Sequence, residues 1–309
     1  MKETGIWTWG HVIYDYRSFF RNMKSLGMNK ITIWNDFAPL NAEALIDEAH
    51  RNGIRVVWGF AWGWDTDCRS IAAGLSENKL RDIGKSVISV FNEQYRDIAG
   101  DGIYFQSFTE LDKREAGGKS IAEYVVELVN STADELLKSY PELNIEFGLH
   151  ATSVKDDLDV IARTDRRVKI IWEDLGAFPF AYDPFDVNNY DETYALAERV
   201  INLRGGGERC GFITKGMTKL DWSAFTHAAG TLVIGESSRE FIERRQLEKN
   251  PLWQELTEGW RLNIGFAEKM FDLFKSSENV VSVQALIEDG MFENEIKEPA
   301  VLFSKLCGD

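Results

Sequence analysis

The sequence predicts a (β/α)8 TIM barrel, in which eight parallel strands close into a cylinder surrounded by helices. Strand and helix signals alternate along the whole chain, which is typical of parallel α/β folds. The length of 309 residues suits one barrel of roughly 250 residues with some extension. There are six prolines and no tract rich in Ser, Gly and Pro, so no internal linker is indicated. We therefore expect a single domain over residues 1–309.

The expected strands are short apolar runs bounded by glycine, asparagine or charged residues. They are residues 5–9, 31–34, 55–60, 102–106, 144–148, 169–172, 210–214 and 231–235. The eighth strand is the least well supported, because only residues 221–229 are available for a helix between it and the seventh strand.

The expected helices begin at capping residues and carry apolar residues at helical spacing. Asp15, Asn41 and Ser76 are the candidate caps of three of them. The helices are residues 15–25, 41–53, 76–98, 120–139, 155–162, 191–204 and 252–275. Residues from about 277 to 309 are expected to form a C-terminal helical extension outside the barrel.

Charge and composition exclude several classes of partner. A formal net charge of −15 disfavours nucleic-acid binding, which needs Lys and Arg to displace counterions. No apolar run approaches the roughly 18 residues of a membrane span. The three cysteines, Cys68, Cys210 and Cys307, show no CxxC spacing, which favours reduced thiols in a cytoplasm. A secreted protein is the alternative if the chain is a piece of a longer one. The oligomeric state is not predicted.

Polar residues repeatedly follow the expected strands. In a barrel of this type the carboxyl ends of the strands meet in one mouth, where the active site is found. The candidates at this mouth are Asp36, Gln106, Glu110, His150, Glu173, Asp174, Lys215 and Glu236. Each of these residues could instead have a purely structural role: in a loop turn, in a surface salt bridge or, for the histidine, in interior hydrogen bonds. Together they predict one polar pocket.

The carboxylates in this set suggest acid and base catalysis. Glu110 lies in phase with Gln106 by the period of two of a strand, so both are expected to face the barrel axis. Held among aromatic residues, Glu110 would act as a general acid. Glu173 and Asp174 are adjacent and point oppositely on a strand, so one is expected to act as base or nucleophile and the other to hydrogen-bond or pair with a cation. Lys215 is the candidate cation for a substrate carboxylate.

Tryptophan is abundant, with ten residues, and several stand at strand ends. The CH faces of sugar rings stack on indoles, while carboxylates and amides bind the hydroxyls. The candidate sugar-binding tryptophans are Trp9, Trp34, Trp62, Trp64 and Trp172. Trp58, inside a strand, is expected in the core. A polar pocket with indole walls predicts a carbohydrate ligand.

Other chemistries find little support. The sequence contains no GxGxxG after a strand, no P-loop, no HExxH and no GxSxG. Its four histidines form no HxH pair. No cofactor and no metal are therefore expected. A divalent ion on Glu110, Glu173, His150 and Glu236 is the alternative, since carboxylate and imidazole suit Mg²⁺ or Mn²⁺.

With these residues in view, the chain resembles the (β/α)8 glycoside hydrolases, most closely the α-glucuronidase-like and β-hexosaminidase-like branches. The resemblance is carried by Asp-Gly-Ile-Tyr-Phe-Gln-Ser-Phe-Thr-Glu at residues 101–110, with support from Trp-Glu-Asp at residues 172–174 and the Trp-rich residues 59–64. It implies a general acid after the fourth strand, at Glu110, and a later carboxylate that activates water. Thr109 stands before Glu110, so the adjacent Asp-Glu pair of the β-hexosaminidases is absent.

Three functions follow from the sequence. The leading one is hydrolysis of a glycosidic bond in a glycan that contains uronic acid or hexosamine. The second is a metal-dependent sugar isomerase or epimerase on the same barrel. The third is a carbohydrate-binding barrel without catalysis, because aromatic pockets serve binding and catalysis equally.

Overall fold

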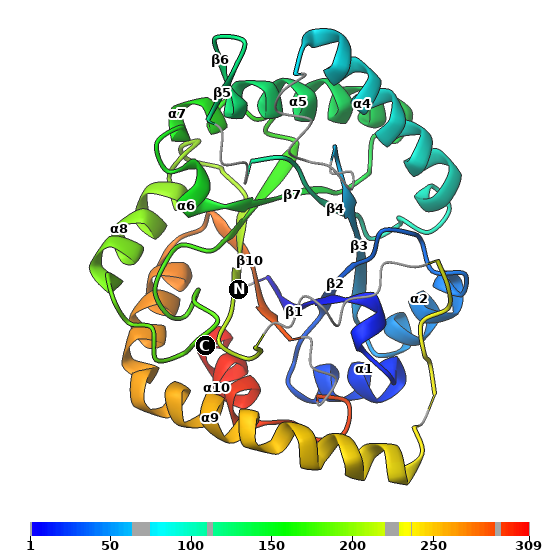
Figure 1. The fold of residues 1–309 in the computed structure, drawn as a ribbon, viewed down its shortest axis with the longest axis vertical. Helices are drawn as coiled ribbons and strands as arrows, with labels where there is room; N and C mark the ends of the chain where they lie inside the picture. The colour runs from blue at the N-terminus through cyan, green and yellow to red at the C-terminus, as the bar shows by residue number, and fades with distance from the viewer. Residues whose placement is uncertain are drawn as a thin grey trace.

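The computed structural model describes residues 2–63, 75–109, 114–219, 229–235, 237–287 and 292–308. It confirms the predicted fold class. Within these ranges, eight parallel strands form a closed barrel in the order β1-β10-β9-β8-β7-β4-β3-β2. Helices surround the barrel on its outer side (Figure 1). The view of Figure 1 looks along the barrel into the end where the strands finish.

The strands match the predicted runs closely except for the last. The barrel strands are β1 (Glu3–Trp9), β2 (Lys30–Trp34), β3 (Arg55–Ala61), β4 (Ile103–Gln106), β7 (Ile145–His150), β8 (Val168–Glu173), β9 (Cys210–Thr214) and β10 (Val280–Leu286). A small antiparallel hairpin, β5 (Glu115–Ala116) and β6 (Lys119–Ser120), lies outside the barrel.

The described helices are α1 (Tyr16–Ser25), α2 (Ala42–Arg51), α4 (Glu77–Val90), α5 (Ile121–Ser139), α6 (Ala151–Val154), α7 (Leu158–Ile161), α8 (Tyr190–Ile201), α9 (Arg239–Ser276) and α10 (Glu298–Cys307). Their starts follow from capping. The Asp15 carboxylate accepts hydrogen bonds from the first backbone N–H groups of α1, as the sequence predicts. Ser120 and Glu123 form a capping box at the start of α5. The expected helix at residues 221–229 falls almost wholly outside the described residues.

The prediction of an eighth strand at residues 231–235 is wrong, because β10 closes the barrel instead. Leu232 exchanges two backbone hydrogen bonds with the Asn41 side chain, at 2.7 and 2.9 Å. The Val233 carbonyl accepts a bond from the N–H of Tyr16 at 2.9 Å. These bonds hold the segment beside α1 and α2 rather than in the sheet. Asn41 occupies the N-cap position of α2, but its side chain makes no capping bond to the helix.

The C-terminal part of the chain therefore completes the barrel. Residues 277–309 contain β10 as well as the expected helix, α10. Helix α9 is longer than predicted, and it runs through Pro251. Strand β1 pairs with β10 on one side and with β2 on the other. A Cβ atom at Gly5 would lie 1.8 Å from the carbonyl oxygen of Lys30, so glycine is required there for β1 and β2 to pair.

Alternation along the strands separates two apolar regions. Inside the barrel lie Trp7, Trp34, Val57, Tyr104, Ile171, Ile213 and Leu286. The residues between them on each strand face outward and pack with the helices in a larger core.

Four charged side chains fill the amino-terminal end of the barrel. Lys30 Nζ lies 2.6 Å from both carboxylate oxygens of Glu146 and 3.3 Å from Glu3. Lys169 Nζ lies 3.0 Å from Glu3 and 2.9 Å from Glu146. All four residues are buried. Burial alone would raise the pKa of Glu146, but Lys30 and Lys169 lower it to about 2. We call these four residues the ion cluster.

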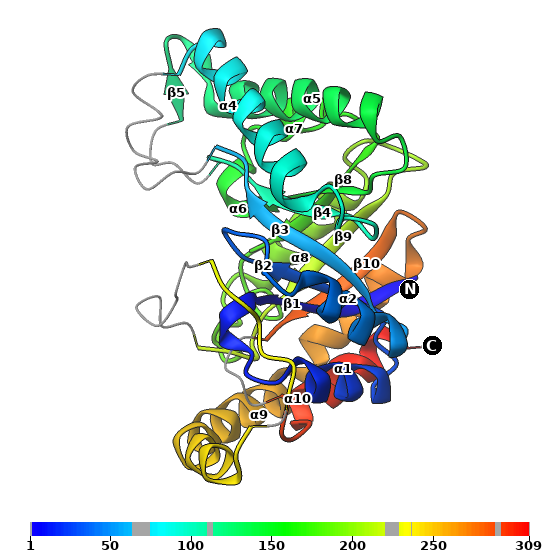
Figure 2. The same cartoon turned by 90° about the vertical axis from the view of Figure 1, so that its right-hand side faces the viewer.

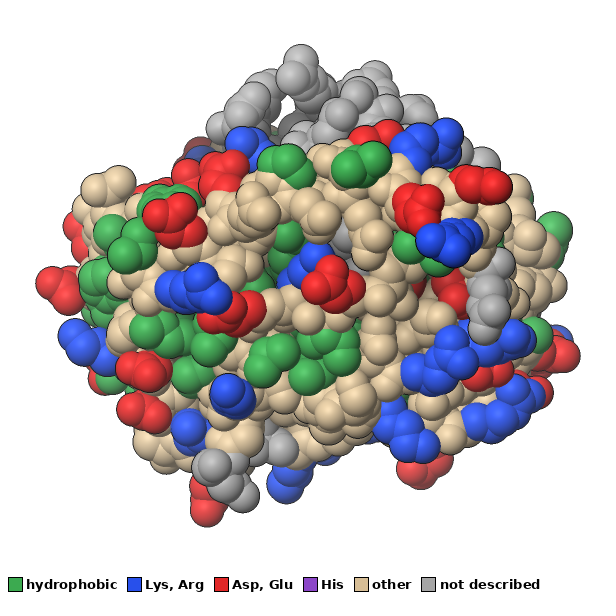
Figure 3. Space-filling model, turned by 90° about the horizontal axis from the view of Figure 1, so that it is seen from below, with side chains coloured by type: hydrophobic (Ala, Val, Ile, Leu, Met, Phe, Trp, Pro, Cys, Tyr) green, Lys and Arg blue, Asp and Glu red, His purple; other side chains and the backbone are tan. Residues whose placement is uncertain are grey.

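The ion cluster and the chain termini lie on the same side of the molecule. Figure 2 shows both termini at one end of the barrel and the strand-to-helix connections at the other. Seen from below, apolar and charged side chains are interspersed on the outer face (Figure 3). In the part of the chain that the structure describes, no helix is both long and apolar enough to cross a membrane.

Replacing Glu146 by Gln should destabilise the protein strongly. Removing one partner of a buried ion pair leaves uncompensated charge, which costs about 3–5 kcal/mol. The free energy of unfolding from urea titration measures this loss. As a control, Asp134→Asn removes an exposed carboxylate paired with Lys138, and its unfolding midpoint should stay close to that of the parent. Equal losses in the two variants would contradict a structural role for the ion cluster.

Stability should also fall at acid pH through the same carboxylate. The folded pKa of Glu146, about 2, is lower than its ordinary value of 4.5. A depressed carboxyl pKa adds stability above the ordinary value, and this contribution is lost as pH falls from about 4.5 toward about 2. The melting temperature measured from pH 7 to pH 2.5 should decline over that window. The decline should be shallower in Glu146→Gln, and identical slopes would argue against this explanation.

Candidate active site

Four neighbouring strands bring polar side chains together at the carboxyl end of the barrel. Gln106 ends β4, His150 ends β7, Glu173 ends β8, and Lys215 follows β9. These strands are consecutive in the barrel order, and His150 is in register with Glu173. Residues distant in sequence therefore meet in one arc of the barrel wall.

Glu173 is the centre of this polar arc. Its side chain is buried, with a residue exposure of 3%. The Gln106 amide donates a hydrogen bond to Oε1 at 2.7 Å, and the Tyr104 hydroxyl donates to the same oxygen. His150 Nε2 lies 3.4 Å from Oε2. Both carboxylate oxygens therefore have polar partners.

These contacts keep Glu173 ionised. Burial alone would raise the pKa of this carboxyl group, but His150, then the charge of Lys215 and the Tyr104 hydroxyl, lower it to about 2. Burial and the Glu173 charge raise the pKa of Tyr104 well above its ordinary value, so Tyr104 remains a neutral donor. At neutral pH the site therefore holds a buried, ionised carboxylate, and Glu173 cannot serve as an acid.

Glycine at position 148 makes room for this arrangement. A Cβ atom there would lie 1.8 Å from the Tyr104 hydroxyl and 2.8 Å from Glu173 Oε1. Gly148 and Tyr104 belong to the neighbouring strands β7 and β4. A larger residue on β7 would push the phenol away from the carboxylate.

Asp174 leaves the strand direction immediately after Glu173. Its φ of 35° lies in the left-handed region, which is uncommon for a residue other than glycine. Thr152 holds it twice, with its backbone N–H on the Asp174 carbonyl at 3.2 Å and its hydroxyl on Oδ2 at 3.1 Å. The same oxygen lies 4.0 Å from His150 Nδ1. The side chain is partly exposed.

Indole rings occupy the opposite side of the barrel. In the barrel order, β1 and β2 lie across from β7 and β8. Trp7 stacks on Trp34 with ring centroids 6.3 Å apart, and Trp9 meets Trp7 edge-on at 4.5 Å. Trp7 and Trp34 are each about 6 Å from the Tyr104 ring. Trp9 is the least buried of the three. We call these three residues the indole wall.

Lys215 and Asp36 occupy different surroundings. Lys215 is buried, and its Nζ lies 4.4 Å from the Tyr182 ring centroid. Asp36 follows β2 and lies near Tyr95, whose pKa is raised by burial and then by the Asp36 charge.

The structure places Trp62 and Trp172 in the outer core, not at the mouth. Each is at most 1% exposed, and Trp62 stacks on Phe105 at 3.7 Å. Trp172 precedes the inward-facing Glu173, so alternation turns it toward the helices. Phe108 also lies in this outer core. The alternation that puts Gln106 inside therefore does not continue past the end of β4.

Three predicted site residues, Trp64, Glu110 and Glu236, lie outside the described residues. Conversely, the sequence reasoning did not single out Trp7 or Tyr182. Trp7 stands two residues before Trp9, so the two-residue period of a strand could have predicted that both face the barrel interior. Tyr182 lies in a long loop between β8 and α8, and no local pattern marks it.

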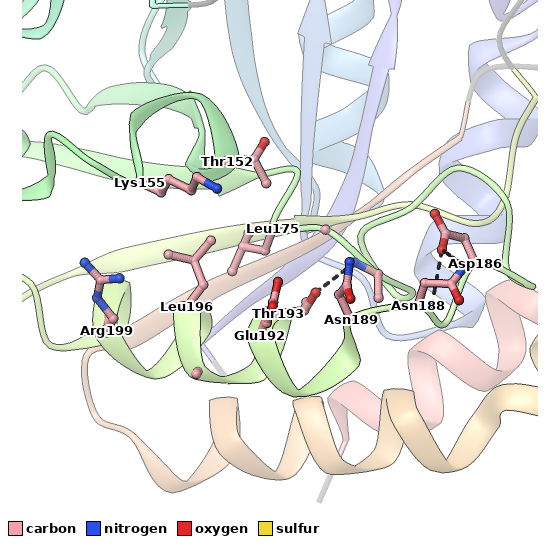
Figure 4. Close-up of a pocket in the computed structure, with 13 residues that line it drawn as sticks. Thr152, Lys155, Leu175, Asp186, Asn188, Asn189, Glu192, Thr193, Leu196 and Arg199 are labelled. Atoms are coloured by element: carbon pink, nitrogen blue, oxygen red, sulfur yellow. Dashed lines mark hydrogen bonds between the residues drawn. The ribbon is translucent and has the colours of Figure 1, made fainter.

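Among the described residues, no group of three or more His, Cys, Asp or Glu side chains is arranged to hold a metal ion. A cavity of ≈ 630 Å³ lies beside the polar arc, on the outer side of the barrel along α8. Figure 4 shows Thr152 and Lys155 on one side of it and α8 residues on the other. Thr152 lines this cavity and also binds Asp174.

No protein-family model matches the chain, and no curated protein matches it. Among solved structures, it is similar to a family 5 xyloglucanase from Paenibacillus pabuli, with a TM-score of 0.52, 8% identity, and coverage of 98% of this chain and 97% of the other. It is also similar to a glycoside hydrolase family 30 subfamily 8 xylanase from Clostridium acetobutylicum, with a TM-score of 0.50, 9% identity, and coverage of 99% and 71%.

A third similar structure is a β-galactosidase from the psychrophilic Marinomonas ef1, with a TM-score of 0.53 and 9% identity. The match covers 98% of this chain, which spans 58% of the length of that protein. At such identities the similarity establishes the barrel fold alone.

The Tyr104→Phe substitution should reveal the charge on Glu173. It removes a donor to a buried carboxylate, and such a bond contributes about 1.5–3 kcal/mol to stability. The matched control is Tyr16→Phe, because Tyr16 is equally buried but donates to the neutral carbonyl of Gly10 at 3.0 Å. Urea unfolding at pH 7 should show the larger loss for Tyr104→Phe. A smaller loss than in the control would mean that Glu173 is not ionised.

Proposed function

We propose that the protein hydrolyses glycosidic bonds and that Glu173 is the carboxylate that attacks the anomeric carbon or activates the attacking water. The observation that carries this proposal is the buried, ionised Glu173 at the carboxyl end of the barrel, facing an indole wall. A carboxylate with a pKa of about 2 is fully charged at neutral pH. It is therefore available as a nucleophile at neutral pH, although so low a pKa makes it a weak general base.

The reaction needs a second carboxyl group. Glycosidases use a pair of acids, one of which protonates the leaving oxygen. We propose Glu110 for this role, because it follows β4, the strand next to β7 in the barrel. The proton would pass from Glu110 to the glycosidic oxygen as the bond between that oxygen and the anomeric carbon breaks. Glu173 would either take a proton from the attacking water or form a glycosyl ester, which water then hydrolyses while giving its proton to Glu110.

The two sides of the barrel would bind different faces of a sugar. Within the indole wall, Trp7 and Trp34 are buried, and the partly exposed Trp9 is the ring that can meet the CH face of a pyranose. Gln106, besides its bond to Glu173, has amide atoms that can meet a hydroxyl group. Sugars combine such faces, so this asymmetry supports a carbohydrate ligand over a purely apolar one.

For the class of sugar, we propose a uronic acid. The buried Lys215 ammonium stands after β9, beside the strand that carries Glu173. A cation at this position can pair with the carboxylate of a uronate, whereas a neutral hexosamine does not need it. Solved barrels of similar fold bear the names xyloglucanase, xylanase and β-galactosidase, which favours carbohydrate chemistry by analogy only.

Turnover of aryl glycosides tests this proposal. A panel of nitrophenyl glycosides that includes uronides, hexosaminides and neutral sugars should reveal activity toward a uronide. Glu173→Gln and Glu110→Gln should each lower kcat by roughly 10²–10⁴-fold. Glu198→Gln, at an exposed carboxylate on α8 that does not line the cavity beside the polar arc, is the matched control and should keep parental activity.

Other outcomes would assign the other functions. A change in tryptophan fluorescence on adding sugars, with no product from any glycoside, would show a binding protein without catalysis. Sugar isomerisation that stops on adding a chelator would show a metal-dependent isomerase. Unchanged turnover in Glu173→Gln would disprove the mechanism.

A further inference from the structure

Glu173 and Asp174 are adjacent acids, and the geometry points to different tasks for them. We propose that His150 is a fixed imidazolium held between the two carboxylates and that Asp174 is its positioning residue, not a reacting acid. The inference concerns the ionic state of the site, and only its activity measurement rests on the proposed function.

The two ring nitrogens of His150 face different carboxylates. Nε2 lies 3.4 Å from Glu173 Oε2, and Nδ1 lies 4.0 Å from Asp174 Oδ2. The neutral ring carries one N–H, whereas the imidazolium carries two and can serve both acids. A ring placed between two acceptors is thus matched by its charged form.

The surrounding charges favour that form. Among the described residues, the negative groups beside the ring are Glu173 on β8 and Asp174 after it. Lys215, after β9, disfavours a further positive charge on the ring, but its charge also acts on Glu173, whose pKa it lowers. Tyr104 on β4 is neutral, because its proton stays on the hydroxyl. The carboxylates of Glu173 and Asp174 stabilise the imidazolium.

Asp174 is held in place by more than the ring. Its left-handed φ of 35° turns the chain out of β8, so that two consecutive carboxylates can approach one imidazole. The Thr152 hydroxyl and N–H fix both its side chain and its carbonyl. Strained backbone of this kind persists where the surroundings hold it, and it is found disproportionately at functional sites.

Asp174 and Glu173 therefore have different roles in the site. Oδ2 of Asp174 accepts a hydrogen bond from the Thr152 hydroxyl and lies 4.0 Å from His150 Nδ1, so its charge attracts the imidazolium without a direct hydrogen bond. The ring presents its positive charge to Glu173 and helps to keep that carboxylate ionised for catalysis. Loss of Asp174 should therefore weaken the site without removing the reacting group.

Nitrogen NMR of the folded protein tests the ionic state directly. With ¹⁵N-labelled histidine, His150→Gln identifies the His150 signals. Both ring nitrogens of His150 should be protonated at pH 7 in the parent. In Asp174→Asn, the midpoint of His150 protonation should fall by about one pH unit, a tenfold loss of proton affinity. Thr152→Val should lower it less, and Thr152→Ser should restore it.

The control is Glu198→Gln, which removes an exposed carboxylate from α8 that does not line the cavity and should leave the midpoint unchanged. Circular dichroism should confirm that every variant is folded. A neutral His150 in the parent at pH 7, or an unchanged midpoint in Asp174→Asn, would overturn the proposal. These outcomes do not depend on any substrate, so they are distinct from failure of the glycosidase assignment.

Activity then separates positioning from reaction. On an aryl glycoside that the parent cleaves, Asp174→Asn should lower kcat about tenfold and leave KM near its parental value. Glu173→Gln should lose far more. An Asp174→Asn variant as inactive as Glu173→Gln, with parental His150 protonation, would make Asp174 a reacting group and refute the proposal.

Discussion

Two lysines and two glutamates buried in the amino-terminal end of the barrel determine much of the rest of the structure. Lys30 and Glu3 come from β2 and β1, and Glu146 and Lys169 from β7 and β8. The ion cluster thus ties one pair of neighbouring strands to the pair across the barrel. At their other ends, the same four strands carry the indole wall and the polar arc. The width of the proposed sugar site is therefore constrained by charges at the far end of the barrel.

The two ends of the barrel show that an altered pKa does not identify a function. Glu146 and Glu173 are both buried, and both have a pKa of about 2. Two lysines enclose Glu146 where the strands begin, and Glu3 pairs with both lysines and with the partly exposed Arg55. Glu173 stands where the strands end, bound by a phenol, an amide and a histidine. Position in the barrel and the type of partner, rather than the size of the shift, distinguish a structural carboxylate from a candidate catalytic one.

Local sequence patterns predicted seven of the eight barrel strands correctly. They did not predict β10, the strand that closes the barrel. Residues 231–235 and Val280–Leu286 are both short and apolar, and only partners distant in sequence distinguish them. Asn41 takes the hydrogen bonds of the first segment, while the backbones of β1 and β9 take those of the second. The same limit applies to tryptophan. A position at or just after a strand end suggested both Trp62 and Trp34 as sugar-binding residues, yet Trp62 packs in the outer core and Trp34 faces the barrel interior.

Alternation on β8 accounts for the positions of Trp172 and Glu173 but not for that of Asp174. Residues 171 and 173 face the interior, so Trp172 must face the helices. The same rule would send Asp174 outward as well, away from the site. It does not, because β8 ends at Glu173 and the left-handed turn at Asp174 changes the direction of the chain. The alternation of side chains between the two faces applies only to residues within the strand. Thr152 keeps this turn in place, and a contact between α6 and the turn after β8 cannot be predicted from either segment alone.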